Sequence, residues 1–278
     1  MIDLKTQLGD PAGLAAARAN AHAAAQILTK AARANLAAEP GDAHSNLGWH
    51  NFMFVTQPMP SKAASFQVGL SLAPFNLMLL KNGAPVANLA LAGQSMADAM
   101  AWLDAQLAQV GLKAASSVVV TYDLPAEVTA IDSFASDIPG LDALSAWFSL
   151  AADALADLAA NLTDLNPGPS AVRCWPHHFD IATYISLESG DAETAKGIGA
   201  GLSPGDGAYT QPYFYVSPWP HLDAGTLPDA PAPGHWHTQG FVGAIATGTE
   251  ILTLDDVATD TRTFLRQSVA TGRKLLDA

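Results

Sequence analysis

Residues 65–91 of this chain read SFQVGLSLAPFNLMLLKNGAPVANLAL, and this stretch decides the fold. It contains three short apolar runs, 65–72, 75–81 and 86–91, which are typical of β-strands. Asn82 and Gly83 lie between the second and third runs, and this dipeptide is the strongest short-range signal for a tight β-hairpin. Together with a further apolar run at 52–56, the stretch predicts an antiparallel meander.

Helices are predicted on both sides of this meander. Residues 11–38 are rich in alanine, start with Pro11 in the first turn and stop at the Glu-Pro-Gly-Asp sequence 39–42. After the meander, Ser95 with Asp98 three residues later is typical of a helix N-terminus, and Gly111 is typical of its end. The apolar stripe of this helix, which we expect to be buried against the sheet, consists of Met96, Met100, Leu103, Leu107 and Val110.

The remaining sequence repeats this order of elements. Strands are predicted at 116–121, 171–174, 179–187, 212–217 and 236–246, consecutive turns at 202–207, and helices from Pro139-Gly140 to Asn166 and over 255–276. The pattern indicates an α+β fold with a mainly antiparallel sheet flanked by helices. We predict a single domain, 1–278, and the repeated order of helix, strands and helix suggests two similar halves, 1–125 and 139–278.

Composition excludes several classes of partner. The chain has 26 acidic and 13 basic residues, a formal net charge of -13, which repels phosphate backbones and anionic lipid. We therefore expect no nucleic-acid partner and no membrane partner for this acidic protein. Cys174 is the only cysteine, so no intramolecular disulfide can form. Because the opening residues also lack an export-signal pattern, we expect a cytoplasmic protein.

Three segments resemble a bacterial protein family. Phe179-Asp-Ile-Ala182, Gly201-Leu-Ser-Pro-Gly205 and Pro212-Tyr-Phe-Tyr215 occur in the order and at the separation seen in the domain of unknown function family numbered 5996. The resemblance is loose over most of the chain and closer in these segments. It implies one continuous α+β domain and no particular substrate. His177, His178 and the sequence Gly234-His-Trp-His237 look like additions to the family pattern.

Histidines are concentrated in the second half, where five of the eight lie between Arg173 and Phe241. Residues two apart on a strand point to the same face, so His235 and His237 should project together, as should His178 and Asp180. Three imidazoles and one carboxylate would suit a divalent metal such as zinc, with an open position for water or substrate. The alternative is that these histidines are hydrogen-bonded packing residues at strand ends.

The same region is rich in aromatic side chains, which could line an apolar pocket with a few polar groups at its mouth. Aromatic packing in the core is the alternative. The predicted ligand-binding residues are Trp175, His177, Tyr213, Tyr215, Trp219 and Trp236. We therefore predict a small-molecule-binding domain with its site in the second half; the alternative is a metal-dependent enzyme that uses the His/Asp cluster. The sequence leaves the ligand, the presence of catalysis and the oligomeric state open.

Overall fold

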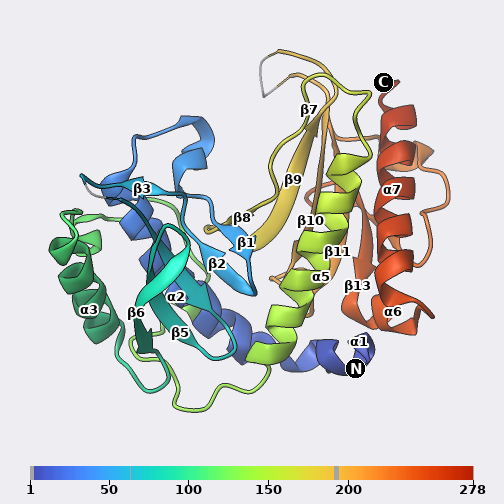
Figure 1. The fold of residues 1–278 in the computed structure, drawn as a ribbon. Coiled ribbons are helices and arrows are strands. Elements are labelled where there is room, and N and C mark those ends of the chain that lie inside the picture. Colours follow the sequence, from blue (N-terminus) through green and yellow to red (C-terminus); the bar gives the residue numbers. More distant parts are fainter. Residues whose placement is uncertain (1–2, 63, 191–193, 278) are drawn as a thin grey trace. The chain divides into compact units, whose positions relative to one another are not determined.

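The fold is taken from a computed structural model that describes residues 3–62, 64–190 and 194–277. The chain forms two compact units. The N-terminal unit consists of Gly13–Ser145 and Cys174–Phe179, and the C-terminal unit consists of Met1–Ala12, Ala146–Arg173 and Asp180–Ala278. Both units contain an antiparallel sheet and helices (Figure 1), so the predicted α+β class is confirmed. The single domain and its half-repeats stay predictions.

The sheet of the N-terminal unit is the predicted meander. Its strands are β1 (Gly48–His50), β2 (Met53–Val55), β3 (Met59–Pro60), β4 (Ser65–Ser71), β5 (Asn76–Lys81) and β6 (Ala84–Ala90). The order is β1-β2-β4-β5-β6, with β3 paired to β4, and all pairs are antiparallel. Asn82 and Gly83 connect β5 to β6 with φ angles of 50° and 81°, the left-handed values that a tight hairpin turn requires.

The helices of this unit begin and end close to the predicted positions. They are α2 (Ala15–Asn35), α3 (Met96–Gln109) and the short α4 (Ala126–Thr129), with 3-10 turns η2 (Pro40–Ser45) and η3 (Ala115–Ser117). A further 3-10 turn, η1 (Pro11–Gly13), spans the boundary between the units at residues 12 and 13. The Ser95 hydroxyl caps α3 by accepting a 3.0 Å hydrogen bond from the Asp98 backbone N–H. In the predicted stripe Leu103 and Leu107 are fully buried, whereas Met96 and Met100 are half-buried.

The predicted strand at 116–121 is wrong. The Asp104 carboxylate accepts hydrogen bonds from the backbone N–H groups of Ala115 (2.6 Å) and Ser116 (3.3 Å). These bonds hold the start of the segment in the turn η3 beside α3, and the residues that follow have no regular structure. The β-branched valines that suggested a strand instead lie along a loop, where Val119 is 81% exposed.

The sheet of the C-terminal unit has the strand order β12-β13-β11-β10-β9-β7. The strands are β7 (Gly168–Pro169), β9 (Asp180–Ser186), β10 (Gly197–Ser203), β11 (Tyr213–Trp219), β12 (His235–His237) and β13 (Gly243–Thr247), and β8 (Arg173–Trp175) lies where the chain passes between the units. Two expectations are corrected here. The single strand at 236–246 is two strands separated by a turn at Gly240 (φ 87°), and Ser203 and its predecessors form β10 rather than turns.

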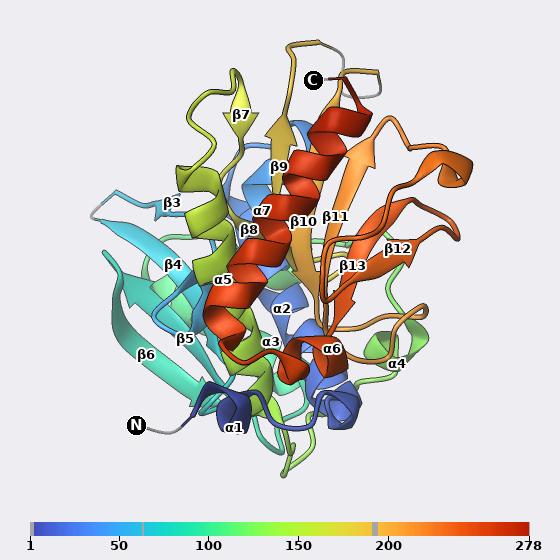
Figure 2. The same ribbon diagram turned by 90° about the vertical axis from the view of Figure 1, so that its right-hand side faces the viewer.

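Helices cover one face of this sheet. They include α5 (Leu141–Ala160), which enters the unit at residue 146, and α7 (Val257–Leu275), with α1 (Leu4–Leu8), α6 (Gly248–Thr253) and the turn η4 (Ala224–Thr226) at the periphery. Figure 2 shows α7 crossing β10 and β11 beside α5. Gly272 brings α7 so close that a Cβ there would lie 3.0 Å from Pro218 and 3.2 Å from Ile198. The opposite face carries Tyr213 and Tyr215 of β11 together with His235 and His237 of β12.

Within the described residues, α5 is the one helix long and apolar enough to cross a membrane. Its apolar face is buried, since Leu144, Phe148 and Leu155 have no exposed area. Of its most apolar 18-residue window, 56% is buried inside the protein. That burial is typical of the core helix of a water-soluble protein.

Candidate functional sites

The predicted site residues are divided between the two units. Trp175, His177 and His178 belong to the N-terminal unit. The C-terminal unit contains Asp180, Tyr213, Tyr215, Trp219, His235, Trp236 and His237.

His178 and Asp180 do not share a strand face. Residues 176–179 form a turn, in which the backbone N–H groups of His178 and Phe179 donate to the Trp175 carbonyl (3.1 and 2.7 Å). Phe179 has φ 61°, and β9 begins only at Asp180. The alternation rule therefore does not apply to this pair, and that premise of the metal prediction is wrong.

The histidines of this turn contact other rings. His177 lies 4.1 Å from His178, 5.6 Å from Tyr122 and 6.2 Å from Trp175, measured between ring centroids. Burial lowers the pKa of His177, and the neighbouring His178 lowers it further. His178 itself is exposed. The side chains of Trp175, His177 and His178 therefore form a small cluster of rings with Tyr122 in the N-terminal unit.

In the C-terminal unit, His235 and His237 do project from the same face of β12, and they meet at Tyr209. The Tyr209 hydroxyl lies 3.1 Å from His235 Nε2 and 3.0 Å from His237 Nδ1. The opposite nitrogen of each ring has its own partner: His235 Nδ1 lies 3.2 Å from a Glu250 carboxylate oxygen, and His237 Nε2 lies 2.6 Å from the Gln239 carbonyl oxygen. We call Tyr209, His235, His237 and Glu250 the Tyr209 cluster.

Glu250 is held in place by the start of α6. Its second carboxylate oxygen accepts hydrogen bonds from the backbone N–H and the hydroxyl of Thr247, both at 2.7 Å, while the Thr247 hydroxyl caps the helix. This capping box fixes the carboxylate that faces His235. The cluster remains open to solvent, since the side chains of His235 and Glu250 are 43% and 34% exposed.

The predicted aromatic residues are only partly together. The ring centroids of Tyr213 and Tyr215, both on β11, lie 6.2 Å apart, and those of Tyr209 and Tyr213 lie 4.9 Å apart. The Tyr213 hydroxyl donates to Asp206 and the Tyr215 hydroxyl donates to Asp180. Trp236 points to the other face and donates its indole N–H to the Pro228 carbonyl (2.7 Å), and Trp219 contacts His221.

Burial and acidic neighbours raise the pKa values of Tyr209 and Tyr213. Burial raises the pKa of Tyr213, and the hydrogen bond to Asp206 raises it further. Burial, followed by the charges of Glu250 and Asp206, also raises the pKa of Tyr209. Both hydroxyls are therefore hydrogen-bond donors at neutral pH.

The part of the chain that the structure describes contains no group of three or more His, Cys, Asp and Glu side chains arranged to hold a metal ion. The predicted set of His178, Asp180, His235 and His237 thus gains no support as a unit. Of the four, the Tyr209 cluster retains His235 and His237, and its remaining members, Tyr209 and Glu250, were absent from the sequence prediction.

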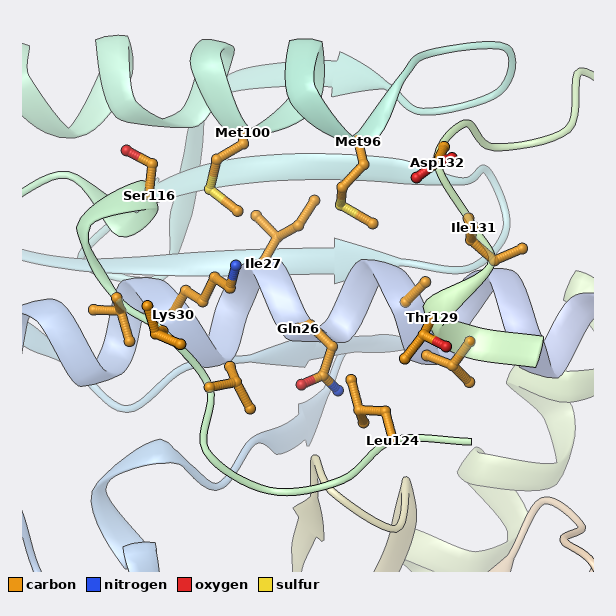
Figure 3. Close-up of a pocket in the computed structure, with 15 residues that line it drawn as sticks. Gln26, Ile27, Lys30, Met96, Met100, Ser116, Leu124, Thr129, Ile131 and Asp132 are labelled. Carbon is orange, nitrogen blue, oxygen red and sulfur yellow. The ribbon is translucent and has the colours of Figure 1, made fainter. Parts of the chain in front are cut away.

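A pocket of about 510 Å³ lies in the N-terminal unit, between α2, α3 and the loop before and after α4. Figure 3 shows Met96 and Met100 pointing from α3 toward Ile27 on α2. The remaining apolar lining comes from Ala23, Val118, Val119, Val120, Leu124, Val128 and Ile131. The half-burial of the two methionines follows from this pocket, because it separates their end of α3 from α2.

Two polar side chains of α2 reach this pocket and differ in their bonding. Gln26 is saturated: it accepts from the Tyr122 hydroxyl (2.6 Å) and donates to the carbonyls of Pro176 (2.8 Å) and His22 (3.3 Å). Lys30 is half-buried and points into the pocket (Figure 3). Across residues 3–62, 64–190 and 194–277, it has no hydrogen bond or ion pair. At the other end of the pocket lie Thr129 and the exposed carboxylate of Asp132.

Comparisons with protein-family models, curated proteins and solved structures give no match to this chain. The resemblance to the domain of unknown function family numbered 5996 stays a prediction. Evidence on function therefore comes from the geometry of the Tyr209 cluster and of the pocket between α2 and α3.

Proposed function

We propose that the protein binds a small amphipathic molecule with a single anionic group in the pocket between α2 and α3. The observation that carries the proposal is the ammonium group of Lys30, which has no partner among the described residues and lies in a mainly apolar lining. This keeps the function predicted from the sequence, small-molecule binding, and moves its site from the second half of the chain to residues 23–132.

The size and lining of the pocket support such a ligand. A volume of about 510 Å³ lies within the range of small-molecule sites, which are mostly apolar with a few polar groups that fix orientation. Each methylene buried there contributes about 0.8 kcal/mol. Met96 and Met100 have flexible, polarizable side chains that adapt to ligands of different shape.

Charge restricts the polar end of the ligand. An ammonium group in apolar surroundings is unfavourable unless an anion accompanies it, so a carboxylate beside Lys30 would compensate its lost hydration. Lys30 is the one cation among the described lining residues, the Asp132 carboxylate lies at the other end of the pocket, and the whole chain carries a formal net charge of -13, so a polyanion would be repelled. A monocarboxylate with an apolar tail fits both constraints.

Isothermal titration with decanoate, 1-decanol and decylamine tests the proposal. We expect decanoate to bind more tightly than the other two, at least tenfold, because it alone offers an anion to Lys30. Lys30→Met should remove this preference, Lys30→Arg should retain it, and Met100→Trp should weaken all binding by filling the pocket. Lys81→Met, at an exposed lysine on the same unit, is the matched control.

Either of two results contradicts the proposal. Equal affinity for decanoate in Lys30→Met and the unmodified protein would exclude Lys30 as the anion partner. Unchanged decanoate affinity in a folded Met100→Trp protein would place the ligand elsewhere. The predicted setting belongs to the same proposal: a cytoplasmic protein without nucleic-acid or membrane partners, supported by its acidic composition and its single, buried Cys174.

A further inference from the structure

The two imidazoles of the Tyr209 cluster are oriented by acceptors on their outer sides. A carbonyl oxygen can only accept, so His237 must carry its proton on Nε2 and donate to Gln239. An ionised carboxylate likewise only accepts, so His235 carries its proton on Nδ1 and donates to Glu250. In the neutral rings, the remaining nitrogens, His235 Nε2 and His237 Nδ1, are therefore both lone-pair acceptors.

Both acceptor nitrogens point at one hydroxyl group. Tyr209 has a single proton and lies 3.1 Å from His235 Nε2 and 3.0 Å from His237 Nδ1, so it can donate to only one of them. The other nitrogen faces the phenol oxygen with no proton between them. With both rings neutral, three electron-pair donors therefore converge on a single proton.

This arrangement has the features of a metal site. Histidine ligands typically donate their second ring N–H to a carboxylate or a backbone carbonyl, which are the partners that Glu250 and Gln239 provide here. Ligands about 2.0 to 2.1 Å from a tetrahedral ion lie about 3.3 Å from one another. The oxygen–nitrogen distances of 3.0 and 3.1 Å are close to that spacing.

We propose that His235 Nε2, His237 Nδ1 and the Tyr209 oxygen bind one divalent first-row transition-metal ion, with Glu250 and the Gln239 carbonyl orienting the two imidazoles. The partial exposure of His235 leaves an entry path and a coordination position for water. The site differs from the set predicted from sequence, because Asp180 is engaged with Tyr215 and His178 belongs to the turn 176–179.

Binding has a definite proton balance. As the bond between the metal and the tyrosine oxygen forms, the phenol O–H bond breaks and its proton passes to the buffer. Neutral histidines give up no proton, because their ligating nitrogens carry lone pairs. The ion should be zinc or, more tightly, copper, since imidazole and oxygen ligands follow the general affinity order of divalent metals.

Zinc titration of the protein, purified without a metal-affinity column, tests the site. We expect one Zn²⁺ per chain and release of about one proton, measured by calorimetry in two buffers of different ionisation enthalpy. Tyr209→Phe should bind at least tenfold more weakly and release no proton, and the double variant His235→Gln, His237→Gln should lose binding. His221→Gln, at an exposed histidine of the same unit, should bind as the unmodified protein does.

Cu²⁺ provides a second readout, a tyrosinate-to-copper absorption band that should be present in the unmodified protein and absent in Tyr209→Phe. Circular dichroism without metal establishes that each variant is folded. The proposal is overturned if the unmodified protein binds no Zn²⁺ at millimolar concentration, if the double variant binds equally well, or if Tyr209→Phe retains both full affinity and proton release. In those cases the cluster is a hydrogen-bond network only.

Discussion

His22 should make the protein sensitive to acid. It lies on α2 with 3% of its surface exposed, stacks on Phe179 at 4.9 Å and donates from Nε2 to the Pro176 carbonyl at 2.8 Å. Burial lowers the pKa of His22 from 6.5 to about 4; the hydrogen bond to the Pro176 carbonyl opposes this shift, and the positive charge of Arg18 adds to it. The folded protein therefore holds this ring in its neutral form.

The sign and size of the effect follow from the two pKa values. Because the unfolded chain binds a proton to His22 at higher pH than the folded protein does, acid favours unfolding. The resulting loss in the free energy of unfolding begins near pH 6.5 as the pH falls and is complete below about pH 4. With 1.36 kcal/mol for each pKa unit, it amounts to about 2 kcal/mol between pH 7 and pH 5 and about 3 kcal/mol in full.

Urea unfolding at pH 7 and pH 5 measures this loss in the unmodified protein, in His22→Gln and in the exposed-site control His221→Gln. We expect His22→Gln to lose about 2 kcal/mol less free energy of unfolding between the two pH values than the other two proteins do. The cost of the substitution itself cancels in this comparison, as does the titration of the carboxylates. An equal loss in all three proteins would refute the assignment of acid sensitivity to His22.

Two further predictions concern single side chains. Ser95→Ala removes the hydroxyl that caps α3, and we expect a loss of about 1 kcal/mol in urea unfolding that Ser95→Asp largely restores; identical stability of the alanine and aspartate variants would contradict the capping role. Gly201→Ala places a Cβ 2.6 Å from the Tyr215 hydroxyl and 2.7 Å from the Ile181 carbonyl oxygen, and should lower the free energy of unfolding by about 1–3 kcal/mol. Gly199→Ala is the matched control, since its Cβ would meet nothing closer than the Ser217 carbonyl oxygen at 3.8 Å, and equal losses at both positions would show that steric overlap is not the cause.

Much of the fold could be predicted because local signals agreed with it. Asn82 and Gly83 specify their turn through backbone conformation alone, and Ser95 and Asp98 specify a helix start within four residues. The turn and the helix start each depend only on residues that are close in sequence. The valines at 118–120 failed as a strand signal because the bonds from Asp104, eleven and twelve residues earlier, hold the preceding turn.

The sites were harder to predict, because they depend on residues that are distant in sequence. Strand alternation identified His235 and His237, but Tyr209 lies 26 and 28 residues before them in an irregular segment. Glu250 has a local sequence signal, because it stands three residues after Thr247, the spacing of a capping box. The pocket had no local signal at all, since apolar residues on α2 and α3 look alike whether they pack together or line a cavity.

The glycines of β10 have a consequence for how the C-terminal sheet finds its pairing. Gly197, Gly199 and Gly201 alternate with Ile198, Ala200 and Leu202, so one side of the strand is bare and the other is apolar. The rings of Tyr184 and Tyr215 rest over the bare side, on Gly197 and Gly201. If β10 slipped by one residue, the places of Gly197 and Gly201 under the rings would be taken by Ile198 and Leu202 or, in the other direction, by Lys196 and Ala200, and the glycines would face α7. The glycine pattern of β10 thus specifies the register of the sheet. A larger residue at Gly201 would reduce the energy difference between the correct and the shifted register, in addition to disturbing the packing.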